Sequence, residues 1–379
     1  MNPADTARLD ELRERLAQLD GSILDLVSQR QTMATEIGRV KASSGRSTRD
    51  FSQEKEVASR ARAAAATLGL DPNLAEEIAL LLIRASLTAQ EQDRVQMSGE
   101  GKGRKVLLIG GAGKMGGWLA RFLASQGFSI EIADPAGSSR DFPHFDDWRS
   151  SRLEHDIIIV AAPLRASGAI LKELAERQPA GVVFDIGSLK TPLRAGLGAL
   201  RDAGVAVTSI HPMFGPDTEL LSGRHVIFID LGHAEATRTA RDLFASTMVV
   251  QVEMDLDSHD RMISYVLGLS HALNIAFLAA LAGSGEDAEG LKNLSSTTFD
   301  AQLDVARRVS RENPHLYFEI QSLNEHGPSV LNNLLSVMTA LSASVQSGDE
   351  AAFVTMMTDG NRYLDTPSDL TPRLHGSTG

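Results

Sequence analysis

A glycine-rich turn between an expected strand and an expected helix constrains the fold of this chain more than any other feature. The apolar residues 106–109 lead directly into Gly-Gly-Ala-Gly-Lys-Met-Gly at residues 110–116, which has the spacing G-x-G-x-x-G. In a strand–turn–helix unit, the first glycine allows a tight turn, the second lets the backbone approach a pyrophosphate, and the third lets the helix pack closely on the strand. The pattern therefore predicts a dinucleotide site. Its expected residues are Gly111, Gly113, Lys114, Met115 and Gly116.

An acidic residue after the next strand indicates which dinucleotide is bound. Residues 129–132 form the next apolar run, and Asp134 follows it, eighteen positions after Gly116. A carboxylate at this place accepts hydrogen bonds from the ribose hydroxyls and repels a 2′-phosphate. The sequence therefore favours NAD over NADP as the cofactor.

The rest of the chain divides around this motif. Between residues 104 and 253, short β-branched runs alternate with helical stretches, which predicts an α/β Rossmann-type domain with a parallel sheet. Residues 1–97 have helical periodicity and predict an all-α N-terminal domain, followed by a linker at 98–103. Residues 254–366 are again helical and predict an all-α C-terminal dimerisation domain. The Pro-, Ser-, Thr- and Gly-rich residues 367–379 predict a disordered tail.

Two apolar surfaces predict a homodimer. The first helix, over residues 9–40, is too long to be covered by the two helices that follow it, and such helices usually pack against a partner chain. Residues 265–283 contain no Asp, Glu, Lys or Arg and approach the length of a membrane span. Because Ser270, His271 and Asn274 interrupt this run, we expect it to lie in a large core or a dimer interface, and not in a membrane.

Composition narrows the compartment and the partners. The formal net charge is −12, from 37 Lys and Arg against 49 Asp and Glu. This balance argues against nucleic-acid or anionic-membrane binding. The chain has no cysteine, which excludes disulfides, thiolate catalysis and Cys-ligated zinc and fits a reducing compartment. Residues 1–20 are rich in charge and lack the apolar centre of a signal peptide. We therefore expect a cytoplasmic protein that holds any anionic substrate with a few placed cations.

Polar side chains at strand ends are the candidates for chemistry. His211 follows an expected strand, and the carboxyl ends of parallel strands are where such sheets bind ligands. A neutral imidazole there could take a proton from a hydroxyl or an amine as hydride leaves. Ser188 and Lys190 follow another strand and would serve binding. His271, on the apolar helix, is either a core residue or part of the active site.

These motifs together resemble a known family. The glycine turn, residues 185–190 and above all His-Pro-Met-Phe-Gly-Pro-Asp at 211–217 resemble prephenate dehydrogenases, and residues 294–296 and 313–317 fit their helical domain. The N-terminal helices resemble chorismate mutases of the all-helical AroQ class. In this order, the domains resemble the bifunctional T-proteins of tyrosine biosynthesis. The resemblance implies rearrangement of chorismate to prephenate, then NAD-dependent oxidative decarboxylation to 4-hydroxyphenylpyruvate.

The resemblance also implies roles for individual residues. On the dehydrogenase side, His211 would take the proton of the ring 4-hydroxyl. On the mutase side, a pericyclic step needs cations around a dicarboxylate and donors at the ether oxygen. Arg13, reaching across the dimer, and Arg30 match the carboxylate-binding positions, while Lys41 and Gln90 match those that flank the ether oxygen.

The remaining mutase positions show one departure from the family pattern. Asp50 and Glu54 match the residues that bind the substrate hydroxyl, and Ser86 joins them. The family has an arginine immediately before the acid at position 54, whereas this chain has Gln53. Glutamine in place of arginine makes the expected mutase site less positive.

A second departure lies in the dehydrogenase half. The family has a carboxylate-binding arginine where this chain has Asp300, and Arg307 and Arg308 follow about two helical turns later. An aspartate there would suit a substrate with a cation. The alternative substrates are therefore 4-amino-4-deoxychorismate and 4-amino-4-deoxyprephenate, which would give 4-aminophenylpyruvate. Two further alternatives are another NAD-dependent dehydrogenase, such as a β-hydroxyacid enzyme, and a mutase fused to a dehydrogenase that only senses ligand.

Overall fold

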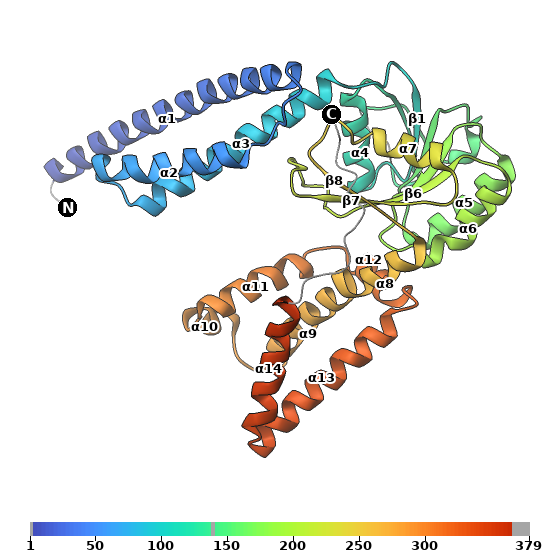
Figure 1. Cartoon of the computed structure of the whole chain (residues 1–379). Coiled ribbons are helices and arrows are strands. Elements are labelled where there is room, and N and C mark those ends of the chain that lie inside the picture. Colours follow the sequence, from blue (N-terminus) through green and yellow to red (C-terminus); the bar gives the residue numbers. More distant parts are fainter. Residues whose placement is uncertain (1–2, 138–140, 366–379) are drawn as a thin grey trace.

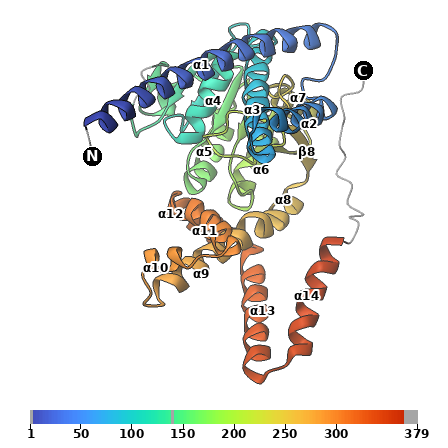
Figure 2. The same ribbon diagram turned by 90° about the vertical axis from the view of Figure 1, so that its left-hand side faces the viewer.

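The chain folds into three parts that follow one another along the sequence (Figure 1). The computed structural model describes residues 3–137 and 141–365. Long helices project from one side of a central sheet domain, and a second group of helices lies below it. A view turned by 90° shows the C-terminal helices below the sheet domain, with α13 and α14 extending away from it (Figure 2). The expected tail at 367–379 lies outside the described residues.

The N-terminal part consists of helices with little core of their own. They are α1 (Pro3–Ser43), α2 (Phe51–Leu68) and α3 (Pro72–Met97). Both α1 and α2 pack against α3. In α1, Ala34 is the one described residue that is buried, whereas Leu16 and Leu19 are 59% and 61% exposed. The predicted helices are therefore present, and the apolar stripe of α1 lies open along its length.

The middle part is a sheet of eight strands in the order β3-β2-β1-β4-β5-β6-β7-β8. Its strands are β1 (Lys105–Ile109), β2 (Ser129–Ala133), β3 (His144–Phe145), β4 (Ile157–Val160), β5 (Val182–Asp185), β6 (Val207–Pro212), β7 (His225–Ile229) and β8 (Val250–Met254). The helices between them are α4 (Lys114–Ser125), α5 (Leu164–Arg177), α6 (Arg194–Asp202) and α7 (Ala234–Asp242), with 3₁₀ turns at Trp148–Ser150 and Thr191–Leu193. Residues of α5 and α6 pack in one core cluster, and residues of α4 and α7 pack in another.

One strand pair departs from the predicted parallel pattern. Strand β7 runs antiparallel to β6, although β8 is again parallel to β7. Residues 213–224 join β6 to β7 without a helix, so this connection is a return loop instead of a crossover. The consequence is a loop that begins immediately after the strand carrying His211.

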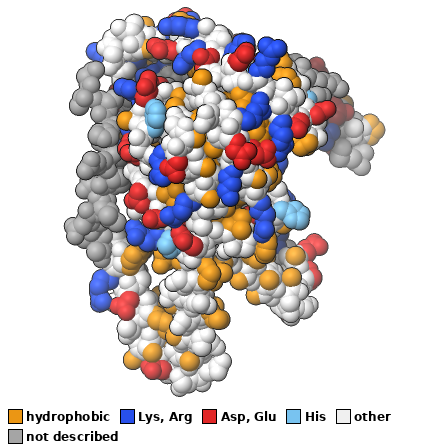
Figure 3. All heavy atoms as spheres, turned by 90° about the vertical axis from the view of Figure 1, so that its right-hand side faces the viewer, with side chains coloured by type: hydrophobic (Ala, Val, Ile, Leu, Met, Phe, Trp, Pro, Cys, Tyr) orange, Lys and Arg blue, Asp and Glu red, His pale blue; other side chains and the backbone are white. Residues whose placement is uncertain are grey.

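The C-terminal part is helical, as predicted. It comprises α8 (Leu256–Ile263), a π-helical turn (Ser264–Leu269), α9 (Ser270–Ala282), α10 (Ala288–Asn293), α11 (Thr297–Ser310), α12 (Pro314–Ser322), α13 (Gly327–Ser347) and α14 (Glu350–Asp365). On the face seen in Figure 3, the C-terminal helices that extend below the sheet domain expose hydrophobic side chains and few charges, whereas charges of both signs mix over the sheet domain.

The apolar run is not buried in the core of a single chain. Among the described residues, the helical run Leu256–Ala282 is long and apolar enough to cross a membrane by length and composition, and 11% of its most apolar window is buried. Tyr265, Val266 and Leu273 are each about half exposed. Of the two positions expected from the sequence, burial in a core of this chain is therefore excluded.

Candidate active sites

The glycine turn has the shape that a dinucleotide needs. The tight turn runs over Gly110, Gly111 and Ala112, and Gly110 takes the left-handed conformation with φ +87°. A Cβ at Gly116 would lie 2.5 Å from the carbonyl oxygen of Gly110, which accounts for the close packing of α4 on β1. The N-terminus of α4, from Gly113, is open to solvent with Lys114, and Met115 is half-buried. These backbone N–H groups fit a pyrophosphate.

Asp134 lies beside the same turn. Its carboxylate accepts hydrogen bonds from the backbone N–H groups of Ala112, at 3.1 Å, and Ala136, at 2.8 Å. The side chain is therefore held at the end of β2, next to the residues that would cradle the phosphates. This placement fits the ribose-binding role expected for it.

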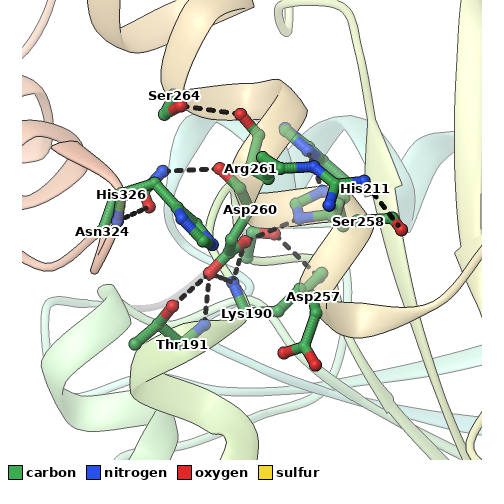
Figure 4. Close-up of polar contacts among 12 residues, drawn as sticks. Lys190, Thr191, His211, Asp257, Ser258, Asp260, Arg261, Ser264, Asn324 and His326 are labelled. Atoms are coloured by element: carbon green, nitrogen blue, oxygen red, sulfur yellow. Dashed lines mark hydrogen bonds and ion pairs between the residues drawn. The ribbon is translucent and has the colours of Figure 1, made fainter. Parts of the chain in front are cut away.

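His211 lies at the end of β6 and belongs to a buried hydrogen-bonded chain (Figure 4). Its Nδ1 is 2.9 Å from Nε2 of His259, and His259 Nδ1 is 2.7 Å from Oδ1 of Asp260. All three side chains are buried. His259 and Asp260 come from α8, so the chain joins the sheet domain to the C-terminal helices.

The hydrogen-bond pattern assigns a tautomer to each histidine. Asp260 also accepts hydrogen bonds from the backbone N–H groups of Lys190 and Thr191 and from the Thr191 hydroxyl, which identifies it as an ionised acceptor. His259 Nδ1 then carries the hydrogen, and its Nε2 accepts from Nδ1–H of His211. The lone pair of His211 is left on Nε2. The sequence did not indicate this arrangement, because His259 lies 48 positions from His211.

Electrostatics keep both histidines neutral. Burial, followed by the proximity of His259 and Lys190, holds the pKa of His211 well below its usual 6.5. Burial also lowers the pKa of His259, against the opposing effect of Asp260. For Asp260, burial acts to raise the pKa, but hydrogen bonds from His259, Thr191 and Lys190 bring it below its ordinary value. A neutral base with a free Nε2 is the form suited to accept a proton.

Lys190 is not placed to bind a substrate. Its ammonium is fully buried and donates to Asp185 Oδ1, the carbonyl of Gly187 and the carbonyl of Ile210, each at 2.8 Å. An ammonium has three hydrogens, so these acceptors use all of them. The predicted substrate contact is therefore replaced by a structural role, fastening the end of β5 to β6. Ser188, in the same turn, is half-buried.

Two further residues expected at this site lie on the C-terminal helices. His271 follows the π-helical turn and stacks on Tyr317 with ring centroids 4.1 Å apart. Its Nδ1 is buried and has no protein partner among the described residues, and burial lowers its pKa. A ligand is one group that could satisfy this nitrogen. Asp300, in contrast, is exposed in the first turn of α11 and accepts a hydrogen bond from Ser295.

A second polar cluster lies between α1 and α3. Arg30 donates to the hydroxyl of Ser86 and to the carbonyl of Leu82. Gln90 donates to the carbonyl of Ala34 at 2.7 Å, while its buried Oε1 has no partner in the described structure. A Cβ at Gly38 would lie 2.8 Å from Gln90 Cγ, so glycine at this position makes room for the amide. Arg30, Ser86 and Gln90 are thus brought together as predicted from the sequence.

The end of α1, the loop that follows it and the first turn of α2 add the remaining polar groups. Lys41 donates to the carbonyl of Thr48 at 3.1 Å. Asp50 caps α2 by accepting from the N–H of Gln53. Glu54 forms a two-bond ion pair with Arg49, at 2.9 and 3.1 Å. Arg49, which no sequence motif indicated, supplies a cation beside Glu54, next to the position where the chain has Gln53.

Arg13 cannot reach this cluster in its own chain. It is exposed on α1 and pairs with Asp10 at 3.4 Å. Seventeen residues separate it from Arg30 on one continuous helix, a distance of about 25 Å. A role for Arg13 in the cluster therefore requires a second chain.

Three family models match the chain. Chorismate mutase type II matches residues 12–91, the nucleotide-binding domain of prephenate dehydrogenase matches 144–252, and its dimerization domain matches 255–359. The T-protein of Enterobacter agglomerans is 25% identical over 349 residues, covering 92% of this chain and 91% of that protein.

Two further relatives bear on the dehydrogenase half. The 4-amino-4-deoxyprephenate dehydrogenase of Streptomyces pristinaespiralis is 25% identical over 271 residues, covering 67% of this chain and 89% of that protein. The crystal structure of prephenate dehydrogenase from A. aeolicus, with hydroxyphenyl propionate and NAD⁺, is 19% identical. It aligns with a TM-score of 0.56 over 69% of this chain and 98% of that one, which shows a shared fold.

Proposed function

Because the chain belongs to the bifunctional family that joins a chorismate mutase to a prephenate dehydrogenase, we propose how its two sites divide the work. Residues 1–97 rearrange chorismate to prephenate. Residues 104–366 oxidise prephenate with NAD and release carbon dioxide, giving 4-hydroxyphenylpyruvate. The observation that carries the second assignment is the buried chain from Asp260 through His259 to His211.

His211 acts as the general base of the oxidation. Its Nε2 accepts the proton of the ring 4-hydroxyl while the C4 hydrogen leaves as hydride. NAD, when bound at the glycine turn, supplies the hydride acceptor. The carboxylate of Asp260, through His259, stabilises the imidazolium that forms. Loss of carbon dioxide then restores aromaticity to the ring, which makes the step irreversible.

In the mutase site, catalysis depends on holding the substrate in a reactive conformation and on stabilising the charge that develops on it. Arg30 and the partner chain's copy of Arg13 hold the substrate carboxylates, and Lys41 and Gln90 donate to the ether oxygen as negative charge develops there. Gln90 donates one amide hydrogen to the carbonyl of Ala34, which leaves the second hydrogen of its nitrogen for the ether oxygen. Asp50, Glu54 and Ser86 bind the hydroxyl side of the substrate.

The assembly that fits these sites is a cytoplasmic homodimer. The open apolar stripe of α1 and the exposed apolar face of α9 both need cover, and the C-terminal helices match a dimerization domain. Because Arg13 lies far from Arg30 in its own chain, each mutase site would need the Arg13 side chain of the other chain, so the mutase reaction requires the dimer. The absence of cysteine fits the cytoplasm.

The 4-amino substrates are the second candidate. Gln53 and Asp300 make both sites less positive, and one relative is a 4-amino-4-deoxyprephenate dehydrogenase. His211 could take a proton from an amine as it does from a hydroxyl. The ordered hydrogen-bond chain at His211 supports catalysis over a role in ligand sensing alone.

One experiment tests both candidates. NADH formation is followed with prephenate and with its 4-amino analogue, each over a range of concentrations, using the full-length protein. We expect the higher kcat/KM with prephenate. A higher kcat/KM with the 4-amino analogue would favour the 4-amino substrates as the physiological ones. Absence of NADH with either substrate would refute the proposed oxidation.

A further inference from the structure

A single loop connects the two active sites physically. Residues 213–224 begin directly after the strand that carries His211, and Met213 packs against the core cluster that contains Ile263 of α8. The far end of the loop contacts the N-terminal helices through Leu221 and Ser222. One end of the loop therefore lies at the dehydrogenase site and the other at the mutase domain.

Glu91 makes the first of these contacts. It follows Gln90 on α3 and is 3% exposed. One carboxylate oxygen accepts from the N–H of Leu221 and the other from the N–H of Met248, both at 2.6 Å. Hydrogen bonds to an ionised acceptor are stronger than those between neutral groups. A residue adjacent to a mutase-site glutamine thus holds two segments of the sheet domain.

Arg49 makes the second contact, and it has two partners. Its Nε and Nη2 pair with Glu54 in the mutase cluster, and its Nη1 donates to the Ser222 hydroxyl at 2.8 Å. The guanidinium therefore joins a mutase-site acid to the loop that begins at the dehydrogenase site.

The loop has space into which it can shift. A cavity of about 610 Å³ separates α3 from α4 beside the loop, lined by residues that include Glu91, Trp118, Phe122, Pro216, Thr218 and Leu221. On that side, hydrogen bonds to Arg49 and Glu91 tie the loop to the N-terminal domain, while Leu221 packs in a core cluster of the sheet domain.

We propose that Arg49, Glu91 and residues 213–224 form an interdomain latch, through which a dicarboxylate in the mutase site weakens prephenate binding at the dehydrogenase site. The carboxylates of the mutase ligand attract the Arg49 guanidinium and pull it away from Ser222. Residues 213–224 then shift, because they lose this hydrogen bond. His211 itself is held by His259, so the effect falls on KM and not on kcat. Arg49 and Glu91 are positioning residues, and the inference rests on the proposed two-site function.

The test uses the full-length protein and a bicyclic dicarboxylate that mimics the rearrangement's transition state and is inert to oxidation. At a saturating concentration of this compound, we expect the KM for prephenate in NADH formation to rise about fivefold, within the usual range of allosteric coupling, with kcat unchanged. S222A, which removes one hydrogen bond, and E91Q should lose most of this response while both basal reactions persist.

Two controls make the result decisive. R39Q breaks the Arg39–Asp93 ion pair on the same helix without touching the sheet domain, and it should respond as the wild type does. R30A should abolish the response, because the compound can no longer bind the mutase site. An unchanged KM in the wild type, a full response in S222A and E91Q, or a response that survives R30A would each overturn the latch. Absence of basal mutase or oxidation activity would instead refute the proposed function.

Discussion

The substitution D260N tests whether the buried hydrogen-bond chain sets the tautomer of His211. In the native structure, Asp260 accepts from His259 on one side and from Lys190 and Thr191 on the other. An asparagine has one oxygen and one NH₂ group. If its oxygen faces the backbone N–H groups, its NH₂ faces His259 and reverses the chain. His259 must then donate to His211, whose Nε2 carries a hydrogen and can no longer accept one.

The size of the expected loss follows from the role of the base. Removal of general-base catalysis lowers rates by about 10²–10⁴, which corresponds to about 3–5 kcal/mol in the activation barrier. D260N should therefore reduce the kcat of oxidation by about that factor. Because the glycine turn and the mutase cluster lie elsewhere, binding of NAD and the mutase rate should remain at wild-type values.

A matched variant separates this effect from loss of stability. T191A removes the hydroxyl that donates to the same carboxylate, at a cost of about 1–3 kcal/mol, but leaves the charge of Asp260 and the tautomers unchanged. It should lower the unfolding temperature and keep kcat within about threefold of the wild type. The assay is steady-state NADH formation alongside thermal unfolding. If D260N keeps most of its kcat, or if T191A loses as much as D260N, the proposed chain does not control the base.

Four further predictions address the base, its pKa, the substrate and the assembly. H211N should lower oxidation by about 10²–10⁴ while sparing mutase activity and NAD binding, and loss of both reactions would indicate a folding role. Because burial holds the pKa of His211 below 6.5, the base stays deprotonated as the pH falls, so the kcat of oxidation should not decline between pH 8 and pH 6.5. D300R should shift the ratio of kcat/KM values toward prephenate by about 10–100-fold, and an unchanged ratio would place Asp300 outside the site. Mixing inactive R13A and R30A chains should restore mutase activity through hybrid dimers, whereas no recovery would argue against an arginine shared between chains.

The features that the sequence predicted well depend on neighbouring residues. The glycine turn and its helix follow from spacing within seven positions, and Asp134 follows from its place after the next strand. His211 could be identified because a strand precedes it and a distinctive motif surrounds it. Where each residue's role depends on local chain geometry, periodicity and spacing are sufficient evidence.

The features that it missed depend on residues brought together from distant positions. In the sequence, His259 and Asp260 look like ordinary polar residues at the start of a helix. In the fold, α8 brings them to the end of β6, where they form a hydrogen-bonded chain with His211. Lys190 was expected to face the substrate, but the carbonyl of Ile210 and the carboxylate of Asp185 consume its hydrogens. The antiparallel pairing of β6 and β7 also departs from the predicted parallel pattern, because the helix-free loop 213–224 returns the chain directly beside β6.

These differences bear on how the dehydrogenase recognises an anionic substrate. Lys190 is committed to the protein and is not free to hold a carboxylate, whereas Arg307 uses one of its N–H groups on the exposed Asp304. Asp300, at the position where the resemblance leads us to expect an arginine, carries a negative charge. The candidates for recognising the substrate are therefore Arg307, the exposed Arg308, a cation from the partner chain, or a substrate that carries less negative charge. D300R distinguishes the last of these from the others. It should lower kcat/KM for an ammonium-bearing substrate, because only such a substrate gains from an aspartate at that position.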